Sequence, residues 1–318
     1  MKAVLDTKPT SVYDDEVSER YHFPRRYLSI IERCIGDWVV LRRPRADGGN
    51  LAYFATAKIT SVDPDPQGAG MSYARFSDYL DFDTLVPWRS ENRYAEEALR
   101  NMPQQEVGVY LRGRSVRSLA DDDFTDLVLK GLNRSLDAAT ALRIGLTIDG
   151  SDMSVTVNTP GERVRHIEQI LTNRLVRDAN FRHLVCDAYG HRCAATRLKV
   201  LDAAGNAEVQ AAHIWGVAKG GPDVIGNGIA LSATVHWLFD SYLISLSDDY
   251  RLLIDTTRVP MDLQEMLKRH GKKIALPIDQ RLWPNPSYIS KHRSIFLNRA
   301  GDQPGDATVD GAPSRFDV

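Results

Sequence analysis

The segment from Gln210 to Asp240 constrains the fold of this chain more than any other stretch of its sequence. An apolar, strand-like run ends at His213, and a glycine-rich loop follows it. Asn227 stands beside a glycine at the end of this loop, and His236 lies in a run with helical character. A strand, a tight loop and a helix are therefore expected in direct succession, with a polar side chain near each junction.

The order His–Asn–His in this segment resembles the HNH nuclease motif, which folds as a ββα-metal unit. Two flanking stretches extend the resemblance: residues 189–196 (YGHRCAAT) and residues 236–240 (HWLFD) are similar to the flanks of the HNH domain in bacterial restriction-type endonucleases. The similarity runs roughly from Asn180 to Ile254, about a quarter of the chain.

The resemblance assigns a role to each of the three residues. It makes His213 the general base that activates water, a task suited to a neutral imidazole, which titrates near pH 6.5. It makes His236 a ligand of one divalent ion per site, Mg²⁺, Mn²⁺ or similar. Asn227 either completes the coordination or braces the loop that aims His213. The implied reaction is hydrolysis of a phosphodiester to 5′-phosphate and 3′-hydroxyl ends.

Two positions depart from the family pattern. Many HNH enzymes have Asp or His directly before the base as a second metal ligand, whereas this chain has Ala212. Asp240, four residues after His236 and hence on the same helical face, can supply the missing ligand; Asp223 or ordered water are alternatives. The chain has three cysteines and no Cys-x-x-Cys pair, so no structural zinc is expected.

Each of these residues, taken alone, has a simpler structural explanation. A single His in an apolar strand is usually a satisfied core residue, and Asn before Gly is usually a turn. His236 and Asp240 could form an ordinary helix pair. The order and the flanks together favour the nuclease.

The region before the motif has a different pattern. Short strand-like runs at 37–41, 51–62 and 73–82 are broken by Gly/Pro turns, which predicts a small β-barrel over residues 19–90. Residues 21–24 (YHFP), 36–39 (GDWV), 52–55 (AYFA) and 76–80 (FSDYL) are similar to PUA-like domains, in particular the EVE-like readers joined to HNH nucleases.

In PUA-like readers the barrel holds a flipped, modified base in an aromatic cage. The resemblance makes Tyr21, Trp38, Tyr79 and Trp88 candidate walls of such a pocket, and Asp78 a candidate acceptor for an exocyclic amine. The alternative for each aromatic ring is a place in the barrel core.

The other predicted parts are a flexible N-terminus (1–18), a helical or mixed connecting region (91–162), the HNH endonuclease domain (163–299) and a flexible tail (300–318). Helices are expected at 94–102, after the aspartates at 121–123, over 164–189 as one or two, and at 261–270. Residues 243–246 and 250–254 predict a hairpin.

Charge is unevenly distributed along a chain whose net charge is −2. Residues 20–45 contain seven arginines and two acidic residues, and residues 161–199 contain eight basic and four acidic residues. Such patches are either phosphate-docking faces or solvated helix faces. The candidate phosphate contacts are Arg25, Arg26, Arg182, Arg192 and Lys219.

Together these patterns predict an α+β protein with an N-terminal PUA-like β-barrel and a C-terminal ββα-metal HNH nuclease domain. The predicted activity is modification-dependent restriction: hydrolysis of double-stranded DNA carrying modified cytosine, by a homodimer. The cysteine usage and the absence of a signal core or an 18-residue apolar run predict a cytoplasmic protein without a membrane span. The alternative is a catalytically decayed protein that binds modified DNA or RNA.

Overall fold

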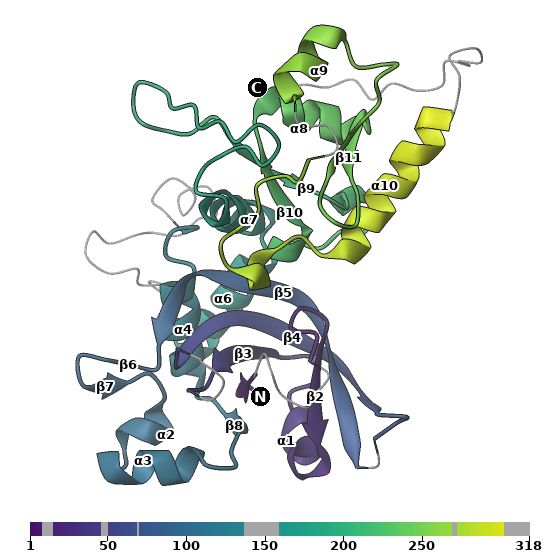
Figure 1. The fold of residues 1–318 in the computed structure, drawn as a ribbon. Coiled ribbons are helices and arrows are strands. Elements are labelled where there is room, and N and C mark those ends of the chain that lie inside the picture. The colour runs from purple at the N-terminus through teal and green to yellow at the C-terminus, as the bar shows by residue number, and fades with distance from the viewer. Residues whose placement is uncertain (8–14, 46–49, 69, 137–158, 269–271, 302–318) are drawn as a thin grey trace. The chain divides into compact units, whose positions relative to one another are not determined.

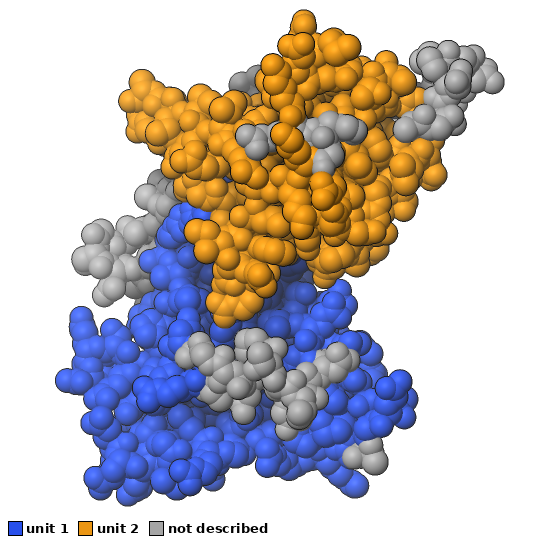
Figure 2. All heavy atoms as spheres, viewed as in Figure 1, with its two compact units in different colours: residues 1–187, 222–228 blue, residues 188–221, 229–318 orange. Residues whose placement is uncertain are grey.

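The computed structural model covers the chain, and its described residues are 1–7, 15–45, 50–68, 70–136, 159–268 and 272–301. The chain divides into two compact units, blue and orange in Figure 2. Unit 1 comprises residues 1–187 and 222–228, and unit 2 comprises residues 188–221 and 229–318. The predicted flexible tail lies outside the described residues from position 302 onward. Within the described ranges, no helix is long and apolar enough to cross a membrane.

Unit 1 is built on a six-stranded sheet in the order β2-β5-β4-β3-β1-β8. The strands are β1 (Ala3–Asp6), β2 (Arg20–Pro24), β3 (Trp38–Arg43), β4 (Ala52–Pro64), β5 (Met71–Pro87) and β8 (Val116–Ser118). β1 and β3 run parallel, and the other neighbouring strands are antiparallel. The strands predicted at 37–41, 51–62 and 73–82 are confirmed as β3, β4 and β5.

The two longest strands, β4 and β5, curl together in Figure 1. Their register shifts at three places, between Tyr53 and Ala55, Thr56 and Lys58, and Ile59 and Ser61. Each irregularity adds local twist to the pair, so the sheet bends instead of staying flat. The result is a curled mixed sheet in an α+β protein.

Two segments of unit 1 differ from the sequence-based expectation. Ala3, Val4 and Leu5, which the sequence places in a flexible N-terminus, are fully buried in β1 between β3 and β8. The predicted helix at 94–102 is reduced to α2 (Glu97–Arg100), because its first residue lies in β7 (Arg93–Tyr94), which pairs with β6 (Arg89–Ser90) in a hairpin. Both turn residues of that hairpin have positive φ, the geometry of a tight two-residue hairpin turn.

Unit 1 also contains helices, some of which pack against the sheet. Along the chain they are α1 (Leu28–Glu32), α2, α3 (Gln104–Leu111), α4 (Asp121–Gly131), α6 (Pro160–Thr172) and α7 (Arg174–Ala188). The predicted helix after the aspartates is confirmed as α4, with all three aspartates in its first turn, where the helix dipole favours acids. The apolar faces of α4 and α6 share one core with the sheet, in which Phe124 and Ile167 are fully buried.

Unit 2 contains the short strands and helices after residue 188. They are β9 (Gln210–His213), β10 (Gly228–Leu231, of which Gly228 is counted with unit 1), α8 (Ala233–Asp240), β11 (Ile244–Leu246), β12 (Leu252–Ile254), α9 (Met261–Leu267) and α10 (Pro286–Gly301). β9 pairs with β10, and the predicted hairpin is confirmed as β11–β12. The helix predicted at 261–270 is confirmed as the shorter α9.

Candidate active site

The candidate catalytic side chains lie on β9 and α8, which contact each other. His213 is the last residue of β9 and is half-buried. α8 buries Val235, Leu238 and Phe239, so its core-facing side is apolar. His236 and Asp240 lie one turn apart on the remaining side, with side chains 22% and 60% exposed. The amphipathic pattern of α8 therefore presents both candidate metal ligands toward solvent.

Both ring nitrogens of His236 have polar neighbours. Its Nδ1 lies 2.9 Å from Oε1 of Gln210, at the start of β9. Its Nε2 lies 3.2 Å from Oδ2 of Asp240. When Nδ1–H donates to the side-chain Oε1 of Gln210, the lone pair of Nε2 is left to bind a metal. Gln210 thus ties the helix that carries the candidate ligands to the strand that ends at His213.

The spacing of these two side chains fits a shared divalent cation. Two neighbouring ligands of an octahedral ion with bonds of about 2.1 Å stand about 3 Å apart. The 3.2 Å between His236 Nε2 and Asp240 Oδ2 is close to that value. Among the described residues, no group of three or more His, Cys, Asp and Glu side chains is gathered for a metal. A cation here would complete its shell with water and substrate phosphate, as Mg²⁺ commonly does.

Asn227 is fully buried in unit 1 and braces its own loop. Its Nδ2 donates to the carbonyl oxygen of Pro222 at 2.9 Å, and its backbone N–H donates to the carbonyl oxygen of Val224 at 2.8 Å. It directly precedes Gly228, where β10 begins. A Cβ on Gly228 would lie 2.2 Å from Val185 of α7, so this close approach requires glycine.

The same loop is fixed to the rest of unit 1 by Asp223. Its buried carboxylate pairs with Arg174 at 3.0 Å and Arg177 at 3.2 Å, both on α7. Arg177 also donates to the carbonyl of Tyr79 on β5 at 3.0 Å. Loop 222–228, α7 and β5 are therefore joined by a continuous polar network, in which Asp223 serves as the partner of two arginines.

The five candidates for a base pocket occupy different environments. Trp38 is 2% exposed and shares an apolar core with the partly buried Trp88. Tyr21 is buried, stacks on Phe23 and donates to the Asp6 carbonyl at 3.2 Å. Tyr79 donates to Asp81 at 2.5 Å, and burial of this phenol raises its pKa. Asp78 is exposed, with a positive φ of 50°.

The candidate phosphate contacts are all exposed: Arg25, Arg26, Arg182, Arg192 and Lys219. The first two lie in the turn before α1, and Arg26 covers the ring of Tyr27 at 4.7 Å. The third lies on α7 in unit 1, whereas Arg192 and Lys219 belong to unit 2.

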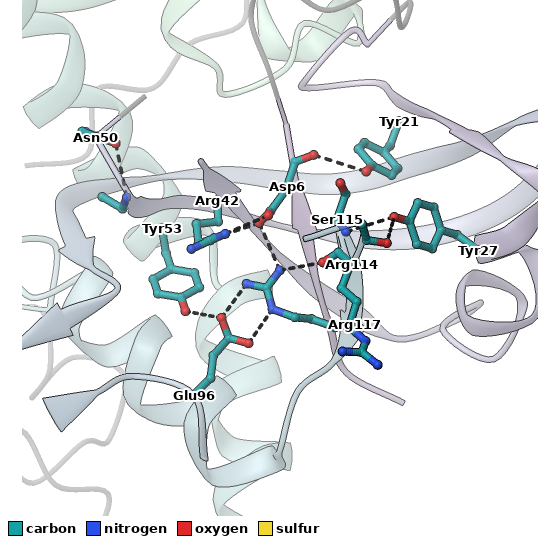
Figure 3. A network of polar contacts seen from close by, with 12 residues as sticks. Asp6, Tyr21, Tyr27, Arg42, Asn50, Tyr53, Glu96, Arg114, Ser115 and Arg117 are labelled. Carbon is teal, nitrogen blue, oxygen red and sulfur yellow. Dashed lines mark hydrogen bonds and ion pairs between the residues drawn. The ribbon is translucent and has the colours of Figure 1, made fainter. Parts of the chain in front are cut away.

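A buried charge network in unit 1 has no signal in the sequence (Figure 3). Arg42 makes two bonds to Asp6, at 2.8 and 2.7 Å, and Arg117 makes two to Glu96, at 2.6 and 2.5 Å. Arg117 also contacts Asp6 at 3.2 Å, and Tyr53 donates to Glu96 at 2.6 Å. Burial disfavours the charged guanidinium, but the two carboxylates outweigh it and raise the pKa of Arg117. Arg42, counted above in a basic patch, is therefore buried in an ion pair with Asp6 and does not lie at the surface.

The comparisons with known proteins match the segment that carries His213, Asn227 and His236. The model of a family described as HNH endonuclease matches residues 193–247, which contain β9, β10, α8 and β11. No curated protein matches the chain. The chain therefore carries an HNH endonuclease domain and is an HNH-type nuclease, a class that binds DNA and generally uses a divalent metal ion.

Two solved structures are similar to the chain at low identity. A modification dependent TagI restriction endonuclease is 14% identical, with a TM-score of 0.28 over 92% of this chain and 80% of that one. The type IV phosphorothioation-dependent restriction endonuclease ScoMcrA is 16% identical, with a TM-score of 0.21 over 93% of this chain and 57% of that one.

Proposed function

We propose that this HNH-type nuclease is a modification-dependent restriction endonuclease that cuts double-stranded DNA carrying modified cytosine. The observation that carries the catalytic part is the placement of His236 Nε2 beside Asp240 while Nδ1 is held by Gln210 of β9. That arrangement supports a two-ligand cation site on the helix next to the strand that ends in His213.

His213 acts as general base in this proposal. It takes a proton from the attacking water, whose oxygen bonds to phosphorus while the bond from phosphorus to the 3′ oxygen breaks, and the departing 3′ oxygen takes a proton from solvent water to become the 3′-hydroxyl. His236 and Asp240 would hold a divalent ion, which would neutralise charge on the phosphate oxygens. Asn227 keeps the loop before β10 in place through its bond to Pro222.

Recognition of the modified base is assigned to residues 19–90 as a PUA-like reader, and cutting to residues 163–299. The curled sheet supports the first assignment. Of the proposed pocket residues, Asp78 is exposed and Trp88 is partly buried, whereas Tyr21, Trp38 and Tyr79 are buried and would have to become accessible to a base. An HNH site grips backbone phosphate and carries little sequence information, so selectivity must come from another part of the chain.

We propose a homodimer because the substrate has two strands to cut. One HNH site cuts one strand, and a twofold homodimer places two sites on the two antiparallel strands of a duplex. The cysteine usage of the chain suits the cytoplasm, where such a nuclease meets incoming DNA.

Digestion of matched duplexes tests both halves of the proposal. Duplexes carrying cytosine, 5-methylcytosine, 5-hydroxymethylcytosine or glucosylated cytosine are incubated with Mg²⁺ or Mn²⁺. We expect faster cutting of at least one modified duplex, and a His213→Ala variant that binds DNA but cuts roughly 10²- to 10⁴-fold more slowly. Equal cutting of all duplexes would reject the reader and keep the nuclease; full activity of the variant would reject His213 as base.

A second candidate is favoured by Ala212, which occupies the usual position of a metal ligand. A catalytically decayed chain would bind modified DNA or RNA without cutting either. No cleavage by the wild-type protein with either metal, together with retained binding, would select this alternative, and competition between RNA and duplex DNA would identify the ligand.

A further inference from the structure

Unit 2 carries a cluster of aromatic rings and cationic side chains outside the proposed catalytic residues. The Nζ atoms of Lys219 and Lys291 lie 5.5 and 5.7 Å from the ring centroid of Trp215. The ring of Tyr242 has Lys219 at 4.6 Å and Arg299 at 4.8 Å, and Lys219 also donates to its hydroxyl at 2.6 Å. We call these five residues the Trp215 cluster.

The cluster joins parts of unit 2 that are distant in sequence. Trp215 and Lys219 lie in the loop after β9, and Tyr242 follows the end of α8. Lys291 and Arg299 lie on α10 (Pro286–Gly301), which is outside the matched residues 193–247. The family match alone therefore assigns no role to α10.

The three cations of the cluster are exposed. Within the part of the chain that the structure describes, Lys219, Lys291 and Arg299 form no ion pair, whereas other arginines of unit 2 do. Arg251 pairs with Asp249, and Arg281 pairs with Asp279. The positive charge of the cluster is thus available to an external anion.

The aromatic rings indicate which anion. Cations lie over the rings of Trp215 and Tyr242, so the rings orient ammonium and guanidinium groups at this surface. A surface of this kind favours the phosphates of a backbone over its bases. Trp215 is two residues after His213, so their Cα atoms are at most about 7 Å apart.

We propose that the Trp215 cluster binds backbone phosphates of duplex DNA next to the cleavage site, which makes α10 part of the DNA-binding surface. This inference rests on the proposed function, because it takes the substrate to be duplex DNA. This binding does not depend on base sequence or base modification. Recognition of the modified base is left to the proposed PUA-like reader, residues 19–90.

Salt dependence of binding tests the cluster. Affinity for a fluorescent duplex is measured by anisotropy between 50 and 200 mM salt, in a His213→Ala background that keeps the DNA intact. Affinity falls as salt rises, so a plot of log affinity against log salt has a negative slope. Each lost phosphate contact reduces the magnitude of this slope by about 0.9. The double variant Lys291→Gln, Arg299→Gln should therefore have a slope whose magnitude is smaller by about 2. Between 50 and 200 mM salt, the factor by which its affinity falls should then be roughly ten times smaller than for its parent.

A matched control removes the same charge elsewhere in unit 2. Arg251→Gln with Arg281→Gln also deletes two exposed cations, each already neutralised by its own aspartate, and should leave the slope unchanged. An unchanged slope in the folded Lys291/Arg299 variant, or an equal drop in the control, would overturn the cluster.

Cleavage by the wild-type protein is measured in parallel. Cutting by the wild type combined with an unchanged slope rejects the cluster and leaves the nuclease proposal standing. Absence of cutting combined with the expected drop in slope supports the cluster and rejects the catalytic proposal. An RNA competitor that displaces the duplex at lower concentration than DNA would overturn the choice of partner.

Discussion

Gln210 shows how a residue without catalytic chemistry sets the properties of one that has it. Its side-chain Oε1 lies 2.9 Å from Nδ1 of His236, and the other ring nitrogen, Nε2, faces Asp240. The sequence predicted the three motif residues from their order and flanks. It could not predict Gln210, because that contact joins positions 26 residues apart and exists only once β9 and α8 meet.

At this scale we expect Gln210→Ala to weaken metal binding. Without an acceptor for Nδ1–H the ring loses its fixed tautomer and orientation, which typically costs ten- to a hundredfold in metal affinity. Titration of Mn²⁺ by calorimetry measures the effect, and Gln104→Ala, at an exposed position of unit 1, is the control. An unchanged Mn²⁺ midpoint would show that Gln210 does not position His236.

Among the elements, α10 is held in unit 2 by a buried histidine. The ring of His292 stacks on Phe239 of α8 at 3.9 Å, and its Nδ1 lies 2.9 Å from the Ser245 hydroxyl of β11. Its Nε2 lies 3.1 Å from the Phe239 carbonyl. Burial disfavours the imidazolium and lowers the pKa of His292 from 6.5 to about 4.

This pKa predicts a pH dependence for the stability of unit 2. Because the unfolded chain binds the proton more readily than the native state, the free energy of unfolding should fall as pH decreases from about 6.5 to about 4, by up to about 3 kcal/mol. His292→Gln removes this titration, so its unfolding free energy should fall less over the same interval. Urea unfolding at several pH values measures both slopes, and identical slopes would contradict the account.

Local patterns predicted elements well where a segment forms its structure from its own neighbours. The strands β3, β4 and β5 and the hairpin β11–β12 were predicted from alternation and turn residues. β1 was not, because a short AVL run becomes a strand only between two partners that are distant in sequence. The helix expected at 94–102 is present only as the shorter α2, since a two-residue turn places the start of the predicted range in a hairpin.

At the level of the whole molecule, charges that look like surface features in the sequence are used in the interior. Asp6 and Arg42 lie on adjacent parallel strands, and Arg117 lies on the edge strand β8 (Figure 3). Glu96 joins them from the segment just before α2. No charge count identifies such a network, because its members become neighbours only in the assembled sheet.

Removing one member should destabilise unit 1. Glu96→Ala leaves Arg117 buried with a single weaker contact to Asp6, and breaking a buried pair in this way costs roughly 3–5 kcal/mol. Glu97→Ala changes the same charge at the neighbouring exposed position and should cost less than about 0.5 kcal/mol. Urea unfolding compares the two, and equal losses would show that the network does not contribute as described.

The metal site is tested most directly by anomalous diffraction from crystals containing Mn²⁺. We expect one peak within about 2.3 Å of both His236 Nε2 and Asp240 Oδ2, close enough to the His213 ring for one bound phosphate to reach both. A peak held by other side chains, or a His213 ring too distant to share a phosphate with that ion, would contradict it.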